Sequence, residues 1–168
     1  MNLILKKFIN DPLNIGAIVE SSNTSAKKIG ELINKKDTKN IIEIGGGTGK
    51  LSEYILNKNL TIIERDIELS ELLKKKYNNS EIINDCGINF LKNYKSKYGL
   101  LTSIPLIKKD TRTDLVNIIN QHLENDQIEW FIILGYKYFN SFNNINFKNH
   151  KRSFVLRNVP PAFIWHYY

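Results

Sequence analysis

Cysteine is nearly missing from this chain of 168 residues, because Cys86 is the single one. A lone cysteine excludes a disulfide framework and a cysteine-built zinc site, and it leads us to expect a reducing, cytoplasmic setting. Long apolar runs are missing too: no stretch approaches the roughly 20 residues that a transmembrane helix needs. Disorder is excluded by composition, since 42% of the residues are hydrophobic and 11% are aromatic, as in globular domains.

Acidic residues are the minority among the charged ones. The 17 Asp and Glu residues stand against 24 Lys and Arg residues, so the net charge is +7. This balance favours an anionic partner, which can be nucleic acid, an acidic lipid surface or a phosphorylated ligand. No acidic residue follows Glu129, and the same tail is rich in aromatic residues. Basic and aromatic residues together can bind nucleic acid, lie at a lipid interface, or build core and edge strands.

The segment 1–10 has apolar residues at helical spacing, Leu5, Phe8 and Ile9, beside two lysines. Its apolar run is too short for a secretory signal, and no small-residue cleavage site follows it. We expect a short amphipathic helix here. Such a helix either packs on its own domain or lies on an anionic membrane.

Short apolar runs alternate with helical periodicity along the middle of the chain. This alternation is typical of βαβ units and predicts an α/β fold, a mostly parallel sheet with helices on both faces. The expected strands are 40–44, 60–64, 80–85, 98–104 and 128–138, and the expected helices are 50–58, 67–77, 88–94 and 111–123. Two last strands, 153–158 and 162–168, are too close together for a helical crossover, so we expect an antiparallel hairpin at the sheet edge.

A glycine-rich turn, Gly45-Gly46-Gly47-Thr48-Gly49, follows the first expected strand. A cofactor can approach bare backbone in this position. The spacing is not that of a dinucleotide loop, and Gly49-Lys50 is followed by Leu51 rather than by the Ser or Thr of a P-loop. With Glu43 the segment is Glu-x-Gly-x-Gly-x-Gly, which resembles motif I of class I S-adenosylmethionine-dependent methyltransferases. A glycine turn of purely structural use is the alternative.

Two acidic residues end the next two expected strands. Glu64 stands 19 residues after Gly45, where a carboxylate can accept both hydroxyls of a ribose. Asp85 can accept from an adenine amino group, and the N–H of Cys86 can donate to a ring nitrogen. Each acid alone could instead be a helix N-cap. Together, the glycine turn and the two acids at successive strand ends predict an S-adenosylmethionine site.

Further segments occur in one order along nearly the whole chain. They are Pro12-Leu-Asn-Ile-Gly16-Ala17-Ile18-Val19-Glu20-Ser21-Ser22, the glycine turn, Ser103-Ile104-Pro105-Leu106, and Arg157-Asn158-Val159-Pro160-Pro161-Ala162-Phe163-Ile164-Trp165. In this order the chain resembles the bacterial phospholipid N-methyltransferase family, whose members methylate phosphatidylethanolamine towards phosphatidylcholine. More distantly, it is similar to ribosomal RNA adenine dimethyltransferases.

The resemblance implies a role for each residue of the site. Glu43 and the glycines would hold the methionine end of the cofactor, Glu64 the ribose and Asp85 the adenine. Ser22 would close over the cofactor near the transferred methyl, and Ser103 begins the substrate-amine motif. The cofactor-binding residues implied in this way are Glu43, Gly45, Gly47, Glu64, Asp85, Cys86, Ser22 and Ser103.

The substrate-amine motif departs from that of adenine methyltransferases, which favour Asn or Asp first and an aromatic residue last. Here Ser103 and Leu106 take these places, so a flipped adenine would lack its usual stacking partner. The candidate catalytic residues are Ser103 and Tyr136. The Tyr136 hydroxyl can accept the amine proton, or it can simply make an interface hydrogen bond. No metal is expected.

We therefore expect one domain, 1–168, with an N-terminal segment 1–39 that covers the cofactor and contacts a membrane, and a Rossmann-like core 40–168. The leading hypothesis is a monomeric, cytoplasmic enzyme, peripheral to an anionic membrane, that methylates the amine of phosphatidylethanolamine or of its methylated derivatives. RNA adenine N6-methylation is one alternative. A catalytically weakened cofactor-binding homologue is the other, since Glu20 replaces the family's proline and the chain is short for the family.

Overall fold

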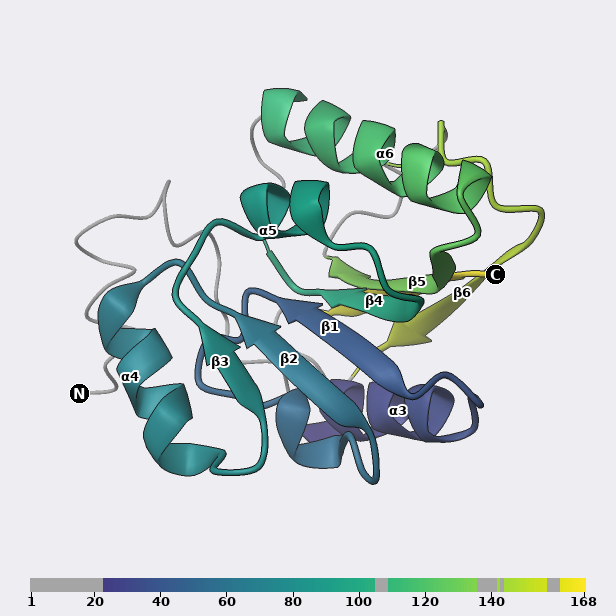
Figure 1. Cartoon of the computed structure of the whole chain (residues 1–168). Coiled ribbons are helices and arrows are strands. Elements are labelled where there is room, and N and C mark those ends of the chain that lie inside the picture. Colours follow the sequence, from purple (N-terminus) through teal and green to yellow (C-terminus); the bar gives the residue numbers. More distant parts are fainter. Residues whose placement is uncertain (1–22, 105–108, 136–141, 143, 157–160) are drawn as a thin grey trace.

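The computed structural model describes residues 23–104, 109–135, 142, 144–156 and 161–168. In these ranges the chain forms a seven-stranded sheet of order β3-β2-β1-β4-β5-β7-β6, with helices on both faces (Figure 1). Five strands run parallel, and they are β1 (Asn40–Ile44), β2 (Asn59–Ile63), β3 (Glu81–Ile83), β4 (Tyr98–Thr102) and β5 (Ile128–Gly135). An antiparallel pair completes one edge, with β7 (Ala162–Tyr167) beside β5 and β6 (His150–Val155) outermost. The predicted Rossmann-like fold with a C-terminal antiparallel hairpin is confirmed.

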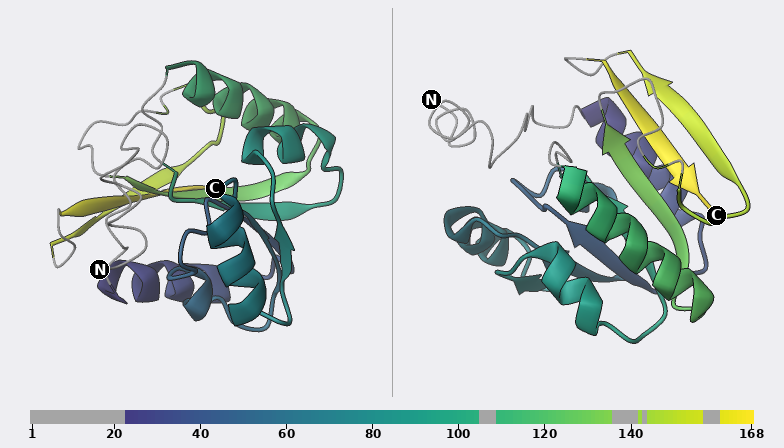
Figure 2. Two further views of the ribbon diagram at one scale, coloured as in Figure 1. Left: turned by 90° about the vertical axis from the view of Figure 1, so that its left-hand side faces the viewer. Right: turned by 90° about the horizontal axis from the view of Figure 1, so that it is seen from above.

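Helices bury both faces of the sheet because alternate residues of the strands point to opposite sides. In β1, Ile42 and Ile44 join the core under α5 (Gly87–Asn93) and α6 (Lys109–Glu124). Ile41 joins the core under α3 (Asn23–Asn34) and α4 (Ile67–Lys76) on the opposite face. Figure 2 shows the two helical layers with the sheet between them. None of the described helices combines the length and the apolar composition that crossing a membrane requires.

The prediction of a helix at 50–58 is wrong, because only the 3₁₀ turn η1 (Ser52–Tyr54) forms there. The side chain of Asn34 explains the difference. Its amide nitrogen donates to the Tyr54 carbonyl at 2.8 Å, and its oxygen accepts from the Leu56 N–H at 3.0 Å. These bonds tie the turn to α3 and occupy the backbone groups that a longer helix would use.

The ends of several other elements also differ from expectation. Strand β3 is shorter than 80–85, since Asn84 leaves the ladder and donates to the carbonyls of Glu64 and Arg65, at 2.9 Å each. Strand β6 starts at His150 rather than at 153, because pairing with β7 begins there. Residues 1–22 and 136–138, on which the N-terminal helix and the end of the fifth strand were predicted, lie outside the described residues.

Candidate functional site

Four parallel strands end at the same level, and this places the predicted site residues at one edge of the sheet. Ile44 of β1 is in register with Ile63 of β2 and with Thr102 of β4, and Ile63 is in register with Ile83 of β3. The residues that follow these ends are Gly45, Glu64, Asn84 and Ser103. In open α/β sheets, ligands bind outside the carboxyl ends of the strands.

The glycine turn after β1 depends on a backbone conformation that other residues adopt rarely. Gly45, Gly47 and Gly49 have φ angles of 80°, 55° and 78°. A Cβ on Gly45 would lie 2.4 Å from the Ile104 Cγ2, so this residue must be glycine for packing as well. Among the described residues, no heavy atom would lie within 4 Å of a Cβ on Gly47. No side chain of these residues therefore covers the backbone of the turn at Gly47.

The Glu64 carboxylate fastens this turn to the end of β2. One oxygen, Oε2, accepts from the Gly47 N–H at 2.9 Å, and the other, Oε1, accepts from the Asp66 N–H at 2.8 Å. Glu64 is 8% exposed. Each carboxylate oxygen can accept two hydrogen bonds, so both retain capacity for a ligand's hydroxyl groups.

Glu43 lies on β1 and is fully buried. The Ser52 hydroxyl donates to its Oε2 at 2.6 Å, whereas its Oε1 accepts no hydrogen bond from the described residues. Burial raises the pKa of Glu43 to about 8, although the hydrogen bond from Ser52 opposes this rise. Glu43 thus carries a proton at neutral pH and joins β1 to η1 behind the glycine turn.

Asp85 and Cys86 follow β3, and the geometry differs here from the predicted roles. The Cys86 N–H donates to Asp85 Oδ1 at 2.6 Å. That N–H can donate to an adenine nitrogen only after the carboxylate turns away. Asp85 is exposed and Cys86 is half-buried, so the space beside them is open to a ligand.

Ser103 follows β4, and its hydroxyl donates to the Gly45 carbonyl at 3.1 Å. This bond brings the first residue of the predicted substrate-amine motif against the start of the glycine turn. The other members of the predicted site, Ser22 and Tyr136, lie outside the described residues, as does Leu106. The site that the structure describes is therefore its cofactor half with Ser103 at the border.

The sequence did not predict two residues that form hydrogen bonds with carbonyl groups of the glycine turn. The Tyr77 hydroxyl donates to the Gly49 carbonyl at 2.5 Å, and the Lys76 ammonium donates to the Thr48 carbonyl at 3.1 Å. Both residues belong to the end of α4 and its cap, 28 residues further along the chain. Only the return of α4 onto the sheet brings them to the turn, so no local signal marks them.

The described residues fit S-adenosylmethionine on two observations. The backbone at Gly47 faces space that no described residue occupies and that a side chain at this position would fill. The neighbouring Glu64 carboxylate is held by two N–H groups and keeps free acceptor sites, which suit a pair of ribose hydroxyls. Within the described ranges no three His, Cys, Asp or Glu side chains gather closely enough to bind a metal ion.

Comparisons with known proteins agree with this geometry. Residues 5–105 match the family model of ribosomal RNA adenine dimethylase. The curated ribosomal RNA small subunit methyltransferase A of Hydrogenobaculum sp. (strain Y04AAS1) is 33% identical over 111 residues, which are 60% of this chain and 40% of that protein. The chain spans less than half the length of the curated relatives that it matches first.

Solved structures share the fold at low identity. A dimethyladenosine transferase from Plasmodium falciparum aligns with a TM-score of 0.64 and 19% identity, over 84% of this chain and 60% of that one. The N-terminal domain of human METTL16 in complex with SAH aligns with a TM-score of 0.61 and 13% identity, over 95% of this chain and 77% of that one.

These comparisons overturn the expectation that a phospholipid at an anionic membrane surface is the main partner. The matching family model and two of the curated relatives are ribosomal RNA methyltransferases, which act on nucleic acid. Another curated relative, 28% identical over 137 residues, is a polyamine aminopropyltransferase of Buchnera aphidicola. Two segments had suggested the lipid family, one within residues 12–22 and one starting at Arg157. Residues 12–22 and 157–160 lie outside the described residues, so the structure gives the lipid interpretation no support.

Proposed function

The chain belongs to the ribosomal RNA adenine dimethylase family, and from this premise we propose that it transfers methyl groups to the N6 amine of adenine in RNA. The observation that carries the proposal is the family match over residues 5–105. This range includes the glycine turn, Glu64, Asp85 and Ser103, which are the same residues that the parallel strands bring to one edge. The predicted cofactor, S-adenosylmethionine, is confirmed as the methyl donor of this class of enzyme.

The cofactor supplies a methyl group on a positively charged sulfur, which needs no further activation by the protein. The chain contributes the correct position and orientation of the cofactor. Glu64 accepts from ribose hydroxyls, and the two N–H groups that hold its carboxylate keep it from rotating away. Gly47 lets the ligand approach backbone without a side chain in between. Orientation of this kind can remove several kcal/mol of the barrier in advance.

Ser103 can replace the Asn or Asp that adenine methyltransferases favour in this place. Its hydroxyl hydrogen is used in the bond to the Gly45 carbonyl, which leaves the oxygen's lone pairs to accept from an adenine N6–H. A hydroxyl acceptor fixed in this way orients the amine without carrying charge. The proposal thus accommodates the serine, and it assigns Ser103 the role of acceptor for the substrate amine.

The test is methyl transfer from labelled S-adenosylmethionine to ribosomal RNA, followed by digestion and mass spectrometry of the nucleosides. We expect label in N6-methylated and N6-dimethylated adenosine, and a Ser103→Ala variant should lose at least tenfold in rate while cofactor affinity stays within twofold. An RNA of the same length without adenine is the control acceptor.

Two results would overturn the proposal. One is cofactor binding without transfer to any RNA, which would indicate a catalytically weakened homologue. The other is label in the adenine-free control at the same level, since the acceptor would then not be adenine N6.

A further inference from the structure

The glycine turn packs directly against the end of α4. A Cβ on Gly49 would lie 2.5 Å from the Tyr77 Cε2 and 2.9 Å from the Leu73 Cδ2. A Cβ on Gly46 would lie 2.9 Å from the Leu73 Cδ1, and Leu73 is fully buried. The distance between the turn and the helix is therefore set by side chains at the end of α4.

Two residues at this end of α4 also hold carbonyl groups of the turn. Lys76 is the last residue of the helix and Tyr77 is its C-cap. The Lys76 ammonium donates to the Thr48 carbonyl at 3.1 Å, and the Tyr77 hydroxyl donates to the Gly49 carbonyl at 2.5 Å. These carbonyls belong to consecutive peptide groups. Since the C=O and the N–H of a planar trans peptide point in opposite directions, each bond also sets the direction of the N–H that follows.

The N–H that follows the Thr48 carbonyl closes the turn. This group is the Gly49 N–H, which donates to the Gly46 carbonyl at 2.8 Å. In the middle of the turn, the Gly47 N–H donates to the Glu64 carboxylate at 2.9 Å. Glu64 thus holds the centre of the turn from the end of β2, whereas α4 holds its last two residues.

Both donors are kept in the place and the protonation state that these bonds require. The Lys76 ammonium lies 2.6 Å from Glu53 Oε1, and this hydrogen bond lowers the pKa of Glu53 below its ordinary value, so the carboxylate is charged at neutral pH. Burial raises the pKa of Tyr77 above its ordinary value, so the hydroxyl keeps its proton. The Lys76 ammonium also lies 5.3 Å from the centre of the Tyr77 ring, so the two donors contact each other.

We propose that Lys76 and Tyr77 are positioning residues of the cofactor site, because they hold two carbonyls of the glycine turn and so keep the Gly47 backbone in the place where S-adenosylmethionine binds. Neither residue touches the cofactor in this role. Without these bonds the peptide groups of the turn can rotate, and the cofactor then has to restore the binding shape at a cost in affinity. The inference rests on the cofactor of the proposed function and is independent of the methyl acceptor.

A positioning role differs in its consequences from a contact that only stabilises the fold. A contact of the second kind contributes to the free energy of unfolding, and its loss leaves the affinity of the folded protein unchanged. Loss of a positioning residue weakens cofactor binding even when every molecule is folded. The test therefore measures S-adenosylhomocysteine affinity by calorimetry and urea unfolding of the unliganded full chain, for each variant, under the same conditions.

Three variants of the two residues separate the hydrogen bonds from packing. Tyr77→Phe removes the hydroxyl and keeps the ring against Gly49, and Lys76→Met removes the ammonium and keeps most of the side-chain length. Each should weaken S-adenosylhomocysteine binding at least fivefold in protein that is folded before denaturant is added. Lys76→Arg keeps the positive charge and the N–H donors, so its affinity should return to within threefold of the wild type.

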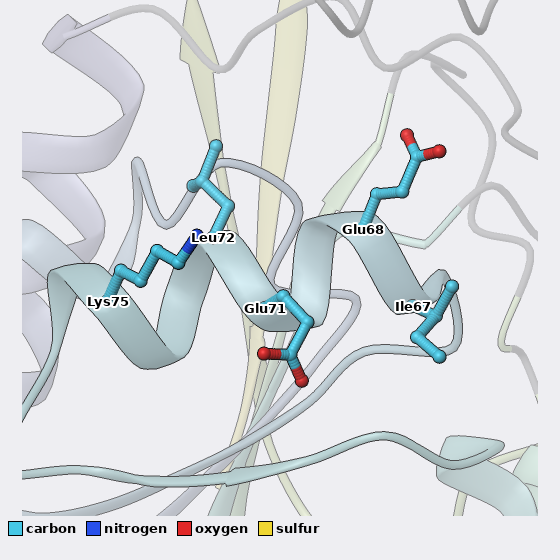
Figure 3. Close-up of a pocket in the computed structure, with 5 residues that line it drawn as sticks. All are labelled: Ile67, Glu68, Glu71, Leu72 and Lys75. Atoms are coloured by element: carbon cyan, nitrogen blue, oxygen red, sulfur yellow. The ribbon is translucent and has the colours of Figure 1, made fainter.

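The chain offers a matched control for each residue. Tyr94 is also a half-buried helix C-cap, at the end of α5, and its ring packs against Tyr98 at the start of β4, near the edge of the sheet opposite the glycine turn. Lys75 precedes Lys76 but lines a hollow on the outer face of α4, together with Ile67, Glu68, Glu71 and Leu72 (Figure 3). Tyr94→Phe and Lys75→Met should bind S-adenosylhomocysteine within twofold of the wild type.

Unchanged affinity in Tyr77→Phe and Lys76→Met would overturn the positioning role, and so would an equal loss of affinity in the two controls. A fall in unfolding free energy without a fall in affinity would show that the bonds only stabilise the fold. Failure of the proposed function is distinguishable, because the expected binding losses without methyl transfer to RNA would reject the acceptor and leave the positioning role in place. Conversely, methylation of RNA with unchanged cofactor affinity in both variants would reject only the positioning role.

Discussion

Glu64 holds the glycine turn through its bond from the Gly47 N–H, and the proposed function gives the same carboxylate a second role as acceptor for a ligand. In a Glu64→Gln variant an amide nitrogen replaces one oxygen and faces the N–H of Gly47 or of Asp66, so one hydrogen bond is lost. We expect S-adenosylhomocysteine affinity to fall at least tenfold by calorimetry. Glu68→Gln, on the outer face of α4, is the control. Unchanged affinity in Glu64→Gln would contradict the site.

Glu43 makes the stability of the protein depend on pH. Burial raises the pKa of Glu43 from an ordinary 4.5 to about 8. Between these values the folded state keeps a proton that the unfolded state has lost, so the free energy of unfolding falls as the pH rises. We expect urea unfolding to show a loss on the order of a few kcal/mol from pH 5 to pH 8.

The Glu43→Gln variant separates this effect from the titration of other groups. Its amide oxygen can still accept from the Ser52 hydroxyl, and it has no proton to lose. Its stability should therefore change less than that of the wild type between pH 5 and pH 8. Parallel curves for the two proteins would show that Glu43 does not hold the proton.

Single residues were predictable from the sequence where a motif fixes their place in the chain. Glu43 is the last residue but one of β1, the glycines and Glu64 follow strand ends, and parallel pairing brings strand ends together. Ser52 and Tyr77 were not predictable in this way. Ser52 meets Glu43 because the chain turns into η1, and Tyr77 meets Gly49 because α4 packs back on the sheet. Such contacts depend on tertiary packing that no local pattern records.

Elements were predicted best where burial dictates their pattern. The apolar runs of β1, β4 and β5 are buried along most of their length, and such runs are typical of central parallel strands. The prediction of a helix at 50–58 was wrong because the Asn34 side chain, 20 residues before Tyr54, forms hydrogen bonds with the backbone of this segment. The last hairpin was predicted, but its register was set by pairing between strands and not by residue type.

The contact between β4 and β5 allows a test of packing at the scale of elements. A Cβ on Gly99 would lie 2.0 Å from the Trp130 Cζ2. Trp130 is 1% exposed, and its indole N–H donates to the Thr38 hydroxyl at 2.9 Å. In a Gly99→Ala variant the indole has to move, and we expect a loss of about 2–3 kcal/mol in urea unfolding.

Gly135 provides the matched control for Gly99 in the neighbouring strand. A Cβ on Gly135 would meet no heavy atom of the described residues within 4 Å, so Gly135→Ala should change the free energy of unfolding by about 0.5 kcal/mol or less. Equal losses in the two variants would show that the indole contact is not the cause.

At the scale of the whole molecule, charge is distributed along the sheet. The β6 end carries Lys148, Lys151 and Arg152, and at the β3 end α4 carries Glu68 and Glu71 together with Lys74, Lys75 and Lys76. With a net charge of +7, the molecule should attract the proposed RNA substrate from any direction, since basic residues lie at both ends of the sheet. In the strand order β7 separates β6 from β5, and β4, which Ser103 follows, lies between β5 and β1. An RNA that binds at Ser103, as proposed, would therefore lie between the β6 end and the glycine turn.

This arrangement predicts that salt weakens RNA binding but not cofactor binding. If about three cations of the β6 end contact phosphates, the logarithm of the single-strand affinity should fall with a slope near −2 against the logarithm of the salt concentration. Anisotropy should then record a loss of roughly 20-fold between 50 and 200 mM salt. S-adenosylhomocysteine has no net charge, and the proposed site holds it by hydrogen bonds at Glu64 and Gly47, so its affinity by calorimetry should change less than twofold. A flat salt profile for RNA would mean that the positive charge does not contact the strand, because phosphate contacts without counterion release do not occur in polyelectrolyte binding. An equally steep profile for S-adenosylhomocysteine would mean that salt acts on the fold, and the variation in RNA affinity would then say nothing about the β6 end.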